Sequence, residues 1–205
     1  MTFQQLYEAN IPDEIYLQYV DLLKPYMDAS TRILDIGCGT GKLLSLLRSY
    51  TNHLYGIDID LEMIQTAKSK YENITFMQHD MHDPLPYFGD IAILSMDVIH
   101  FTENPERVLA HVMDALDQEG IIIFDYFTNS LENIYEIHQT PFPYTWKRII
   151  DGNTIHHTVR YNNQEYILKQ YLHPHFDFLT FLKKHSFDVS LVQSIDPNKT
   201  IIIAK

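Results

Sequence analysis

Basic residues and cysteine are scarce in this sequence, and each shortage excludes a class of protein. The 205 residues contain 15 Lys and Arg against 27 Asp and Glu, which gives a formal net charge of −12. Because nucleic-acid binding needs clustered Lys and Arg, this balance argues against an extended nucleic-acid-binding face. The single cysteine, Cys38, excludes an internal disulfide and fits a reducing compartment.

Long apolar runs are absent as well. Stretches such as 121–124 are far too short to cross a bilayer, which takes roughly 20 apolar residues. The first residues, Met1 to Leu6, have neither a basic segment nor an apolar core, so we expect no signal peptide and a cytoplasmic location. The length and the 45% hydrophobic content predict that residues 1–205 form a single domain with one large core.

What the sequence does contain is a glycine-rich stretch that follows a β-branched run. Residues 33–44 read Ile-Leu-Asp-Ile-Gly-Cys-Gly-Thr-Gly-Lys-Leu-Leu, a pattern typical of a strand, a tight turn and a helix. Glycines let the backbone adopt turn conformations that a Cβ forbids, and they let a ligand approach the main chain closely. The pattern therefore predicts a cradle for a nucleotide-like ligand.

The spacing of the glycines decides between nucleotide types. A dinucleotide fingerprint would place its third glycine where this chain has Lys42. A phosphate-binding P-loop needs four residues before Gly-Lys and then Ser or Thr, whereas three residues separate Gly37 from Gly41 and Leu43 follows Lys42. Both phosphate motifs fail. Asp35, at the end of the strand, is a poor neighbour for a pyrophosphate but a good one for an ammonium group.

The stretch from Leu34 to Gly41 closely resembles the first motif of class I S-adenosylmethionine (SAM)-dependent methyltransferases of the bacterial small-molecule type. The resemblance implies an α/β three-layer sandwich with a seven-stranded, mostly parallel sheet of order 3-2-1-4-5-7-6, in which the last strand is antiparallel. It also implies that SAM is the cofactor and S-adenosylhomocysteine (SAH) the product, bound at Asp35, Gly37, Cys38 and Gly39. No metal is expected.

The hydrophobic pattern outside this motif alternates between strands and helices. It predicts strands at 53–58, 73–77, 90–95 and 121–126, and helices that begin at Asp60 and Asn104. An amphipathic helix is predicted over 13–27, within an N-terminal segment of about 1–29 that would cover the ligand, with Tyr7 as a cofactor contact. The chain is predicted to close with a helix over 176–185 and an antiparallel pair at 187–193 and 200–204.

Residues at the ends of the predicted strands supply further cofactor contacts. Asp58 ends the second strand about twenty residues beyond the glycines, where a carboxylate can accept hydrogen bonds from both ribose hydroxyls. Ile59 follows it. Ser95 and Met96 end the fourth strand, at the sheet edge where open α/β folds bind ligands.

The stretch after the third strand is assigned by resemblance. In methyltransferases of this type a polar residue there meets the adenine amino group and an apolar neighbour packs on the ring, so Asp80 and Met81 take these roles. His79 and His82 flank Asp80, which leaves a metal site open as an alternative. Because no third ligand stands at a zinc-like spacing, we expect surface or capping roles for both histidines.

Residues 131–174 depart from the alternation of strands and helices. Stretches at 144–150, 154–161 and 165–172 are joined by Asp-Gly-Asn and Asn-Asn, which are typical hairpin connectors. They predict a small inserted antiparallel sheet that roofs the substrate pocket. Trp146 and Tyr144 either form a wall of that pocket or fix the sheet to the core. Alternation places His156 and His157 on opposite faces, which argues against a shared metal.

Catalytic residues are harder to identify, because a methyltransferase mainly holds the acceptor in line with the methyl–sulfur bond and excludes water. His100 follows the fourth strand and can titrate near neutrality, so it is either a base or, in its apolar context between Ile99 and Phe101, a structural histidine. Asp97 and Tyr126 are weaker candidates at neighbouring strand ends.

The sequence therefore predicts a SAM-dependent methyltransferase that acts on an oxygen or nitrogen of a small molecule by direct in-line displacement, as a monomer or homodimer without membrane contact. Two alternatives stay open: a methyltransferase for RNA or protein, and a non-catalytic SAM-binding partner protein. The Asn-Pro-Pro-Tyr type motif of base and glutamine methylation is absent, because Ser-Met-Asp-Val stands at 95–98. The acidic charge also makes nucleic acid the weaker partner.

Overall fold

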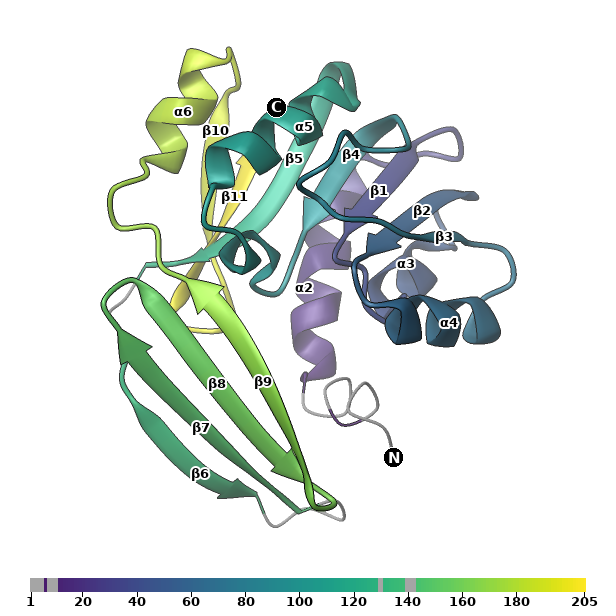
Figure 1. Cartoon of the computed structure of the whole chain (residues 1–205). Helices are drawn as coiled ribbons and strands as arrows, with labels where there is room; N and C mark the ends of the chain where they lie inside the picture. Colours follow the sequence, from purple (N-terminus) through teal and green to yellow (C-terminus); the bar gives the residue numbers. More distant parts are fainter. Residues whose placement is uncertain (1–5, 7–10, 129–130, 139–142) are drawn as a thin grey trace.

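Figure 1 shows a computed structural model of the chain, which describes residue 6 and residues 11–128, 131–138 and 143–205. The main sheet consists of β1 (Arg32–Ile36), β2 (His53–Asp58), β3 (Thr75–Gln78), β4 (Gly89–Leu94), β5 (Leu116–Phe127), β10 (Val189–Gln193) and β11 (Lys199–Ala204). The helices are α2 (Asp13–Leu23), α3 (Lys42–Leu47), α4 (Leu61–Lys70), α5 (Pro105–Asp114) and α6 (Phe178–Lys184), with short 3₁₀ helices η1 (Lys24–Tyr26) and η2 (Val98–Phe101).

The order of the main sheet is β3-β2-β1-β4-β5-β11-β10. Pairs among the first five of these strands are parallel, whereas β11 is antiparallel to both β5 and β10. Counted within this sheet, β10 is the sixth strand and β11 the seventh, so the order is the predicted 3-2-1-4-5-7-6. The labels run higher because β6 to β9 form a separate sheet.

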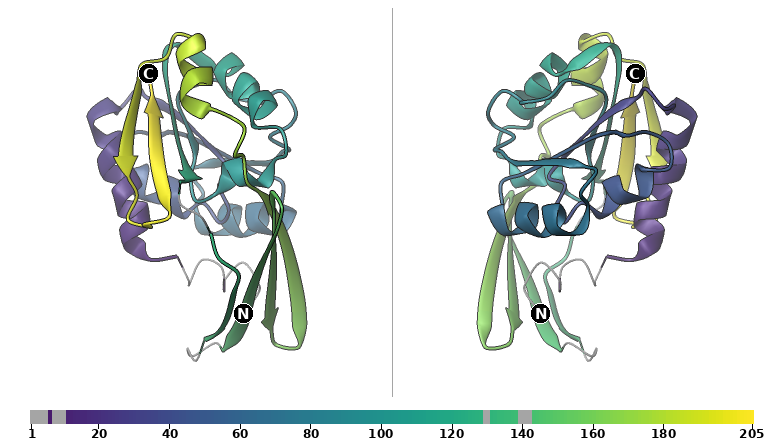
Figure 2. Two further views of the ribbon diagram at one scale, coloured as in Figure 1. Left: turned by 90° about the vertical axis from the view of Figure 1, so that its left-hand side faces the viewer. Right: turned by 90° about the vertical axis from the view of Figure 1, so that its right-hand side faces the viewer.

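Helices cover both faces of the main sheet. Ile33 of β1 and Ile93 of β4 belong to a core beneath α2, α3 and α4, while Leu34 and Ala92 belong to a second core beneath α5 and α6. Successive residues of these strands thus bury opposite faces, as parallel strands between two helical layers do. The arrangement is the predicted three-layer sandwich (Figures 1 and 2). Within the described ranges, none of the helices is long and apolar enough to span a bilayer.

Element boundaries follow local backbone chemistry. The helix predicted over 13–27 ends at Leu23, and a 3₁₀ turn continues it because Pro25 lacks the amide that an α-helical bond requires. The fifth strand begins at Leu116 instead of 121, since it pairs with Gly89 beyond a bulge in the β4 ladder. The predicted helix start at Asp60 is confirmed, because its side chain accepts hydrogen bonds from two first-turn amides.

The second sheet has the order β6-β7-β8-β9 and is antiparallel throughout. Its strands are β6 (Ile134–His138), β7 (Tyr144–Asp151), β8 (Thr154–Tyr161) and β9 (Gln164–Tyr171). Three of them match the predicted stretches; β6 was missed, since it is a short edge strand in which Tyr135 and Ile137 are exposed. The sheet extends from the end of the main sheet at which α2 begins (Figure 1).

Candidate active site

The glycine-rich turn joins β1 to α3 and is held by the backbone of β2. The amides of Gly37 and Cys38 both donate to the Ile57 carbonyl, at 2.8 and 2.9 Å. Gly37 has a φ of +71°, and a Cβ there would lie 2.5 Å from Val98 Cγ2. A Cβ on Gly39, at φ +54°, would meet no atom within 4 Å. The turn is therefore packed tightly on one side and open to a ligand on the other.

A cavity of about 380 Å³, here called the first cavity, lies on the open side of this turn. It is lined by every predicted cofactor residue that the structure describes: Asp35, Gly37, Cys38, Gly39, Asp58, Ile59, Asp80, Met81, Ser95 and Met96. The remaining one, Tyr7, lies outside the described residues. Strand ends spread over residues 35–96 thus meet at one cavity, as the topology requires.

The carboxyl group of Asp35 is buried in this cavity wall without a counter-charge. Asp35 is 2% exposed, and its Oδ1 has no hydrogen-bond partner among the described residues. Burial raises the pKa of Asp35 well above its usual value, and the charge of Asp58 raises it further. Since an unpartnered buried polar group costs roughly 1–3 kcal/mol, the site favours a ligand that brings a cationic hydrogen-bond donor.

Asp58 holds the glycine turn in place through its carboxylate group. Its Oδ2 accepts a hydrogen bond from the Gly39 amide and its Oδ1 one from the Asp60 amide, both at 2.9 Å. Burial raises the pKa of Asp58, although these amide bonds act in the other direction. The carboxylate therefore faces the cavity and also ties the glycine turn to the start of α4.

Asp80 and His82 form a pair in another part of the wall. Asp80 Oδ1 accepts a bond from the His82 amide at 2.9 Å and lies 2.7 Å from His82 Nδ1, and the amide bond is the main reason that the pKa of Asp80 is lowered. His82 Nε2 bonds to Thr102 Oγ1, and His79 Nε2 bonds to the Pro84 carbonyl. Both histidines thus hold local structure, and the described residues contain no group of three or more metal-binding side chains.

A second cavity of about 400 Å³ adjoins the first. The two share the lining residues Ile11, Met96, Phe101 and Leu168. Met96 and Asp97 both have left-handed backbone conformations, with φ values of 59° and 73°. This conformation costs a residue other than glycine about 1–2 kcal/mol, and such strain gathers at functional sites. The strained pair lies just after β4. Met96 lines both cavities, and Asp97 lines the second cavity.

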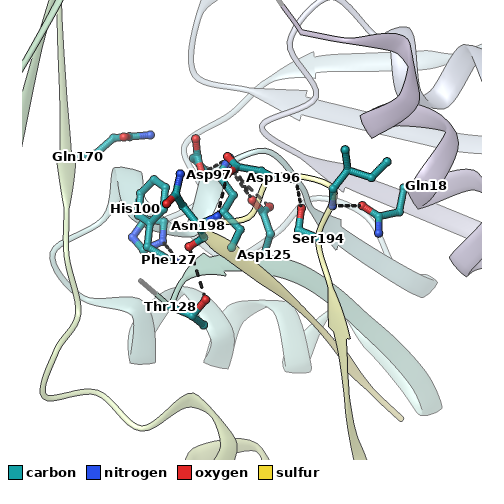
Figure 3. Close-up of polar contacts among 12 residues, drawn as sticks. Gln18, Asp97, His100, Asp125, Phe127, Thr128, Gln170, Ser194, Asp196 and Asn198 are labelled. Atoms are coloured by element: carbon teal, nitrogen blue, oxygen red, sulfur yellow. Dashed lines mark hydrogen bonds and ion pairs between the residues drawn. The ribbon is translucent and has the colours of Figure 1, made fainter. Parts of the chain in front are cut away.

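Charged groups from several strand ends meet in the second cavity (Figure 3). Lys199 Nζ lies 2.7 Å from Asp97 Oδ1, 3.4 Å from Asp196 Oδ2 and 3.6 Å from Asp125 Oδ2. Asp125 also accepts hydrogen bonds from the Tyr19 hydroxyl at 2.8 Å and the Asp97 amide at 3.3 Å. Burial, and then the charge of Asp97, raises the pKa of Asp125 to about 6.

His100, the leading candidate base, has both ring nitrogens engaged with the backbone. The Phe127 amide donates to Nε2 at 3.1 Å, so Nδ1 carries the proton and donates to the Tyr171 carbonyl at 2.7 Å. His100 is 2% exposed, and burial lowers its pKa to about 4. The geometry favours the structural alternative, in which the ring joins β5 to the end of the second sheet.

The other two catalytic candidates lie on opposite faces of the main sheet. Tyr126 packs against Phe178 of α6, with 5.2 Å between ring centroids, and is not among the residues that line either cavity. Asp97 lines the second cavity. Sequence reasoning missed Tyr19, Asp125 and Lys199; Asp125 follows the same strand-end rule that identified Asp35.

Known proteins share this architecture. A family model described as a methyltransferase domain matches residues 27–180. The chain belongs to the SAM-dependent methyltransferase family, and its cofactor is SAM. Malonyl-(acyl-carrier protein) O-methyltransferase from Bacillus cereus is 28% identical over 136 residues, which cover 63% of this chain and 50% of that protein. The chain spans about half the length of the curated relatives it matches.

Solved methyltransferase structures superpose on nearly the whole chain. A SAM-dependent methyltransferase from Clostridium acetobutylicum has a TM-score of 0.81 at 15% identity, covering 99% of this chain and 95% of that one. SAM-bound CalS10, an amino pentose methyltransferase from Micromonospora echinaspora, has a TM-score of 0.76 at 15% identity, covering 100% and 97%. The fold of this methyltransferase, with its second sheet, is therefore shared with these proteins.

Proposed function

We propose that this methyltransferase transfers the methyl group of SAM to an oxygen or nitrogen atom of a small molecule bound in the second cavity. The observation that carries the proposal is the junction of the two cavities at Met96, at the carboxyl end of β4. A volume of about 400 Å³ suits a metabolite-sized acceptor. The cavity also has a mixed lining, with charged groups at the ends of main-sheet strands and both aromatic and polar groups from the second sheet.

In this proposal the first cavity holds SAM by its charged and polar ends. Asp35 receives the ammonium group, which supplies the partner that its buried oxygen lacks. Asp58 accepts the ribose hydroxyls, and the adenine lies at Asp80 and Met81. The remaining contacts come from Gly37, Cys38, Gly39, Ile59, Ser95, Met96 and, in the N-terminal segment, Tyr7. When bound, SAM supplies an electrophilic methyl group on a sulfonium centre.

Asp97 orients the acceptor. Its side chain is 24% exposed, and its carboxylate can accept the O–H or N–H hydrogen of the reacting atom. This contact turns a lone pair of that atom toward the junction at Met96, while Lys199 holds the carboxylate in place. Because positioning alone can contribute roughly 7–11 kcal/mol, the reaction needs no stronger base.

The similar structure CalS10 acts on an amino pentose, which supports a small polar acceptor. Three carboxylates and two basic side chains, Lys199 and Arg148, line the second cavity, and this excess of negative charge favours an amine or hydroxyl over an anionic acceptor. The net charge of −12 weighs against RNA, and the unpartnered Asp35 weighs against a protein that has lost its cofactor site.

The first test separates cofactor binding from catalysis. We expect Asp58→Ala to weaken SAH binding at least several-fold by calorimetry. We expect Asp97→Asn to lower kcat by about 10²-fold, in the range of general acid–base and orienting groups, with SAH affinity unchanged. SAH formation would be followed over a panel of hydroxylated and amino compounds, with Asp114→Asn, an exposed acid at the end of α5, as the control.

Three outcomes would contradict the proposal. Unchanged SAH affinity in Asp58→Ala removes that residue from the cofactor site. Unchanged kcat in Asp97→Asn removes the orienting role. Absence of turnover on the whole panel, together with retention of RNA or a stable protein partner, favours the macromolecular or non-catalytic alternative.

A further inference from the structure

A string of polar side chains crosses the second sheet and ends in the second cavity. Trp146, His157 and Gln170 come from β7, β8 and β9, and the strand register places them on one face. All three line the second cavity. His157 and Gln170 are 8% and 5% exposed, and Trp146 is half-buried, so most of the string is shielded from solvent.

Trp146 fixes the direction of every hydrogen bond in this string. An indole N–H can only donate, and Trp146 Nε1 lies 3.0 Å from His157 Nδ1, so that ring nitrogen accepts. The other ring nitrogen, Nε2, therefore carries the proton and donates to Gln170 Oε1 at 2.9 Å. Burial lowers the pKa of His157, which keeps the ring neutral at physiological pH.

The amide nitrogen of Gln170 is consequently turned away from His157. A flipped amide would set the N–H of Gln170 against the N–H of His157, so the string allows one orientation only. The nitrogen has no hydrogen-bond partner among the described residues. The side chain extends from β9 toward the part of the cavity that contains Asp97 (Figure 3). The nitrogen is not one of the fully buried polar atoms of the described residues that lack a partner, so it is open to the cavity, where a ligand can accept its hydrogen bond.

We infer that Gln170 donates a hydrogen bond to an uncharged oxygen of the methyl acceptor, such as a hydroxyl, so that the acceptor is an oxygen-bearing small molecule and not an amine without oxygen. This inference rests on the proposed function, because it places the acceptor between Asp97 on one wall and Gln170 on the other. The oxygen is uncharged because the three carboxylates of the cavity outnumber its two basic side chains, Lys199 and Arg148, and so disfavour an anionic group. Trp146 and His157 act through Gln170 and are positioning residues.

The orientation of the string can be tested without any acceptor. Trp146 is the single tryptophan of the chain, so its indole N–H gives one nuclear magnetic resonance signal. At pH 7.5 we expect the ¹⁵N shifts of His157 to show the proton on Nε2, with the indole N–H protected from solvent exchange. A proton on Nδ1 would overturn the inference, because the amide of Gln170 would then be free to present its oxygen to the cavity.

The contact with the acceptor is tested with two amines that differ in their hydroxyl groups, D-glucosamine and cyclohexylamine. Binding to the SAH complex would be followed by Trp146 fluorescence. We expect the wild-type protein to bind glucosamine about three- to tenfold more tightly, the range of one hydrogen bond. Gln170→Leu and Gln170→Glu should abolish this difference, since neither presents a donor to the cavity. Gln170→Leu should leave cyclohexylamine binding unchanged, whereas the added carboxylate of Gln170→Glu should strengthen the binding of both cationic amines alike. Gln164→Leu, at an exposed position of the same strand, should retain the difference.

Equal or absent binding of the two amines by the wild-type protein would overturn the inference, as would a glucosamine preference that survives both Gln170 substitutions. Calorimetry with SAH distinguishes a failure of this inference from a failure of the proposed function. Normal SAH binding without a glucosamine preference refutes only the role of Gln170, whereas loss of SAH binding by the wild-type protein refutes the cofactor site itself.

Discussion

At Asp35 the chain keeps a carboxyl group where folding alone would favour an amide or an apolar side chain. The residue is 2% exposed, and one of its oxygens has no partner among the described residues. Burying an ionised carboxylate is expensive, and the group responds with a raised pKa. The free protein thus carries a cost that a cationic ligand can remove, which is the usual relation between stability and function at a binding site.

Asp35→Asn should therefore stabilise the ligand-free protein and weaken the complex. We expect the free energy of unfolding at pH 7 to rise by roughly 1 kcal/mol, because the buried charge is gone. We expect SAH affinity to fall at least about tenfold, equivalent to roughly 1.4 kcal/mol, because the ammonium group loses its carboxylate. Urea denaturation and calorimetry measure the two effects. A less stable variant with unchanged SAH affinity would contradict both.

The difference in stability between Asp35→Asn and the wild-type protein should depend on pH in one direction. Burial places the folded-state pKa of Asp35 above its unfolded value, so protonation favours the folded state. That contribution is complete below the unfolded pKa of about 4 and is lost as the pH rises through the folded pKa. The stability advantage of the asparagine variant should thus grow from pH 4 toward pH 7.

Among the elements, α2 connects the most distant parts of the chain. Its Tyr19 hydroxyl donates to Asp125, and Gln18 bonds to the Gln193 carbonyl at 2.9 Å and the Ile195 amide at 3.0 Å. These contacts join the helix to the end of β5 and to the loop between β10 and β11. The helix therefore sets the electrostatic environment of the second cavity as well as covering the sheet.

Tyr19→Phe should move the acid limb of the pH–rate profile to higher pH. Burial and the charge of Asp97 raise the pKa of Asp125 to about 6, and the bond from Tyr19 opposes this. Without the hydroxyl the pKa of Asp125 rises further, so this carboxylate becomes fully charged only at higher pH. Lys199→Met should move the acid limb of the pH–rate profile in the same direction, and further than Tyr19→Phe does. SAH formation between pH 5 and 8 measures the shift.

The control for this profile is Tyr26→Phe, which removes a hydroxyl from η1, outside the residues that line the second cavity. Its acid limb should coincide with that of the wild-type protein. An acid limb that stays in place in Tyr19→Phe would show that Asp125 does not titrate during turnover.

These same elements show what the sequence can predict and what it cannot. Strands of the main sheet follow from apolar runs, and their acidic ends meet because parallel strands end at one edge, which located Asp35 and Asp58. Lys199 escaped prediction because it reaches the site from an antiparallel strand, and Tyr19 because it lies on a helix 106 residues from its partner Asp125. The role of Gln170 depends on strand register, which alternation alone leaves undetermined.

At the scale of the whole molecule, the charge distribution suits a cationic cofactor. The chain has a net charge of −12, and the first cavity is lined by Asp35, Asp58, Asp60 and Asp80 with Lys42 as the basic residue. Lys42 is itself paired with Asp13 at 2.6 Å. Such a field attracts a cation and repels phosphates, which agrees with the failure of both phosphate-binding glycine motifs.

Salt and competing nucleotides test this field directly. SAM carries one positive charge more than SAH, so raising the salt concentration from about 0.01 to 0.5 M should weaken SAM binding by a larger factor than SAH binding, because screening removes the long-range attraction. At a concentration of about 100 times its Kd, SAH should stabilise the fold by roughly 2.7 kcal/mol in thermal unfolding. ATP and NAD should leave the unfolding temperature unchanged. Equal salt dependence of SAM and SAH, or stabilisation by ATP, would show that the acidic lining does not choose the ligand and that shape alone does.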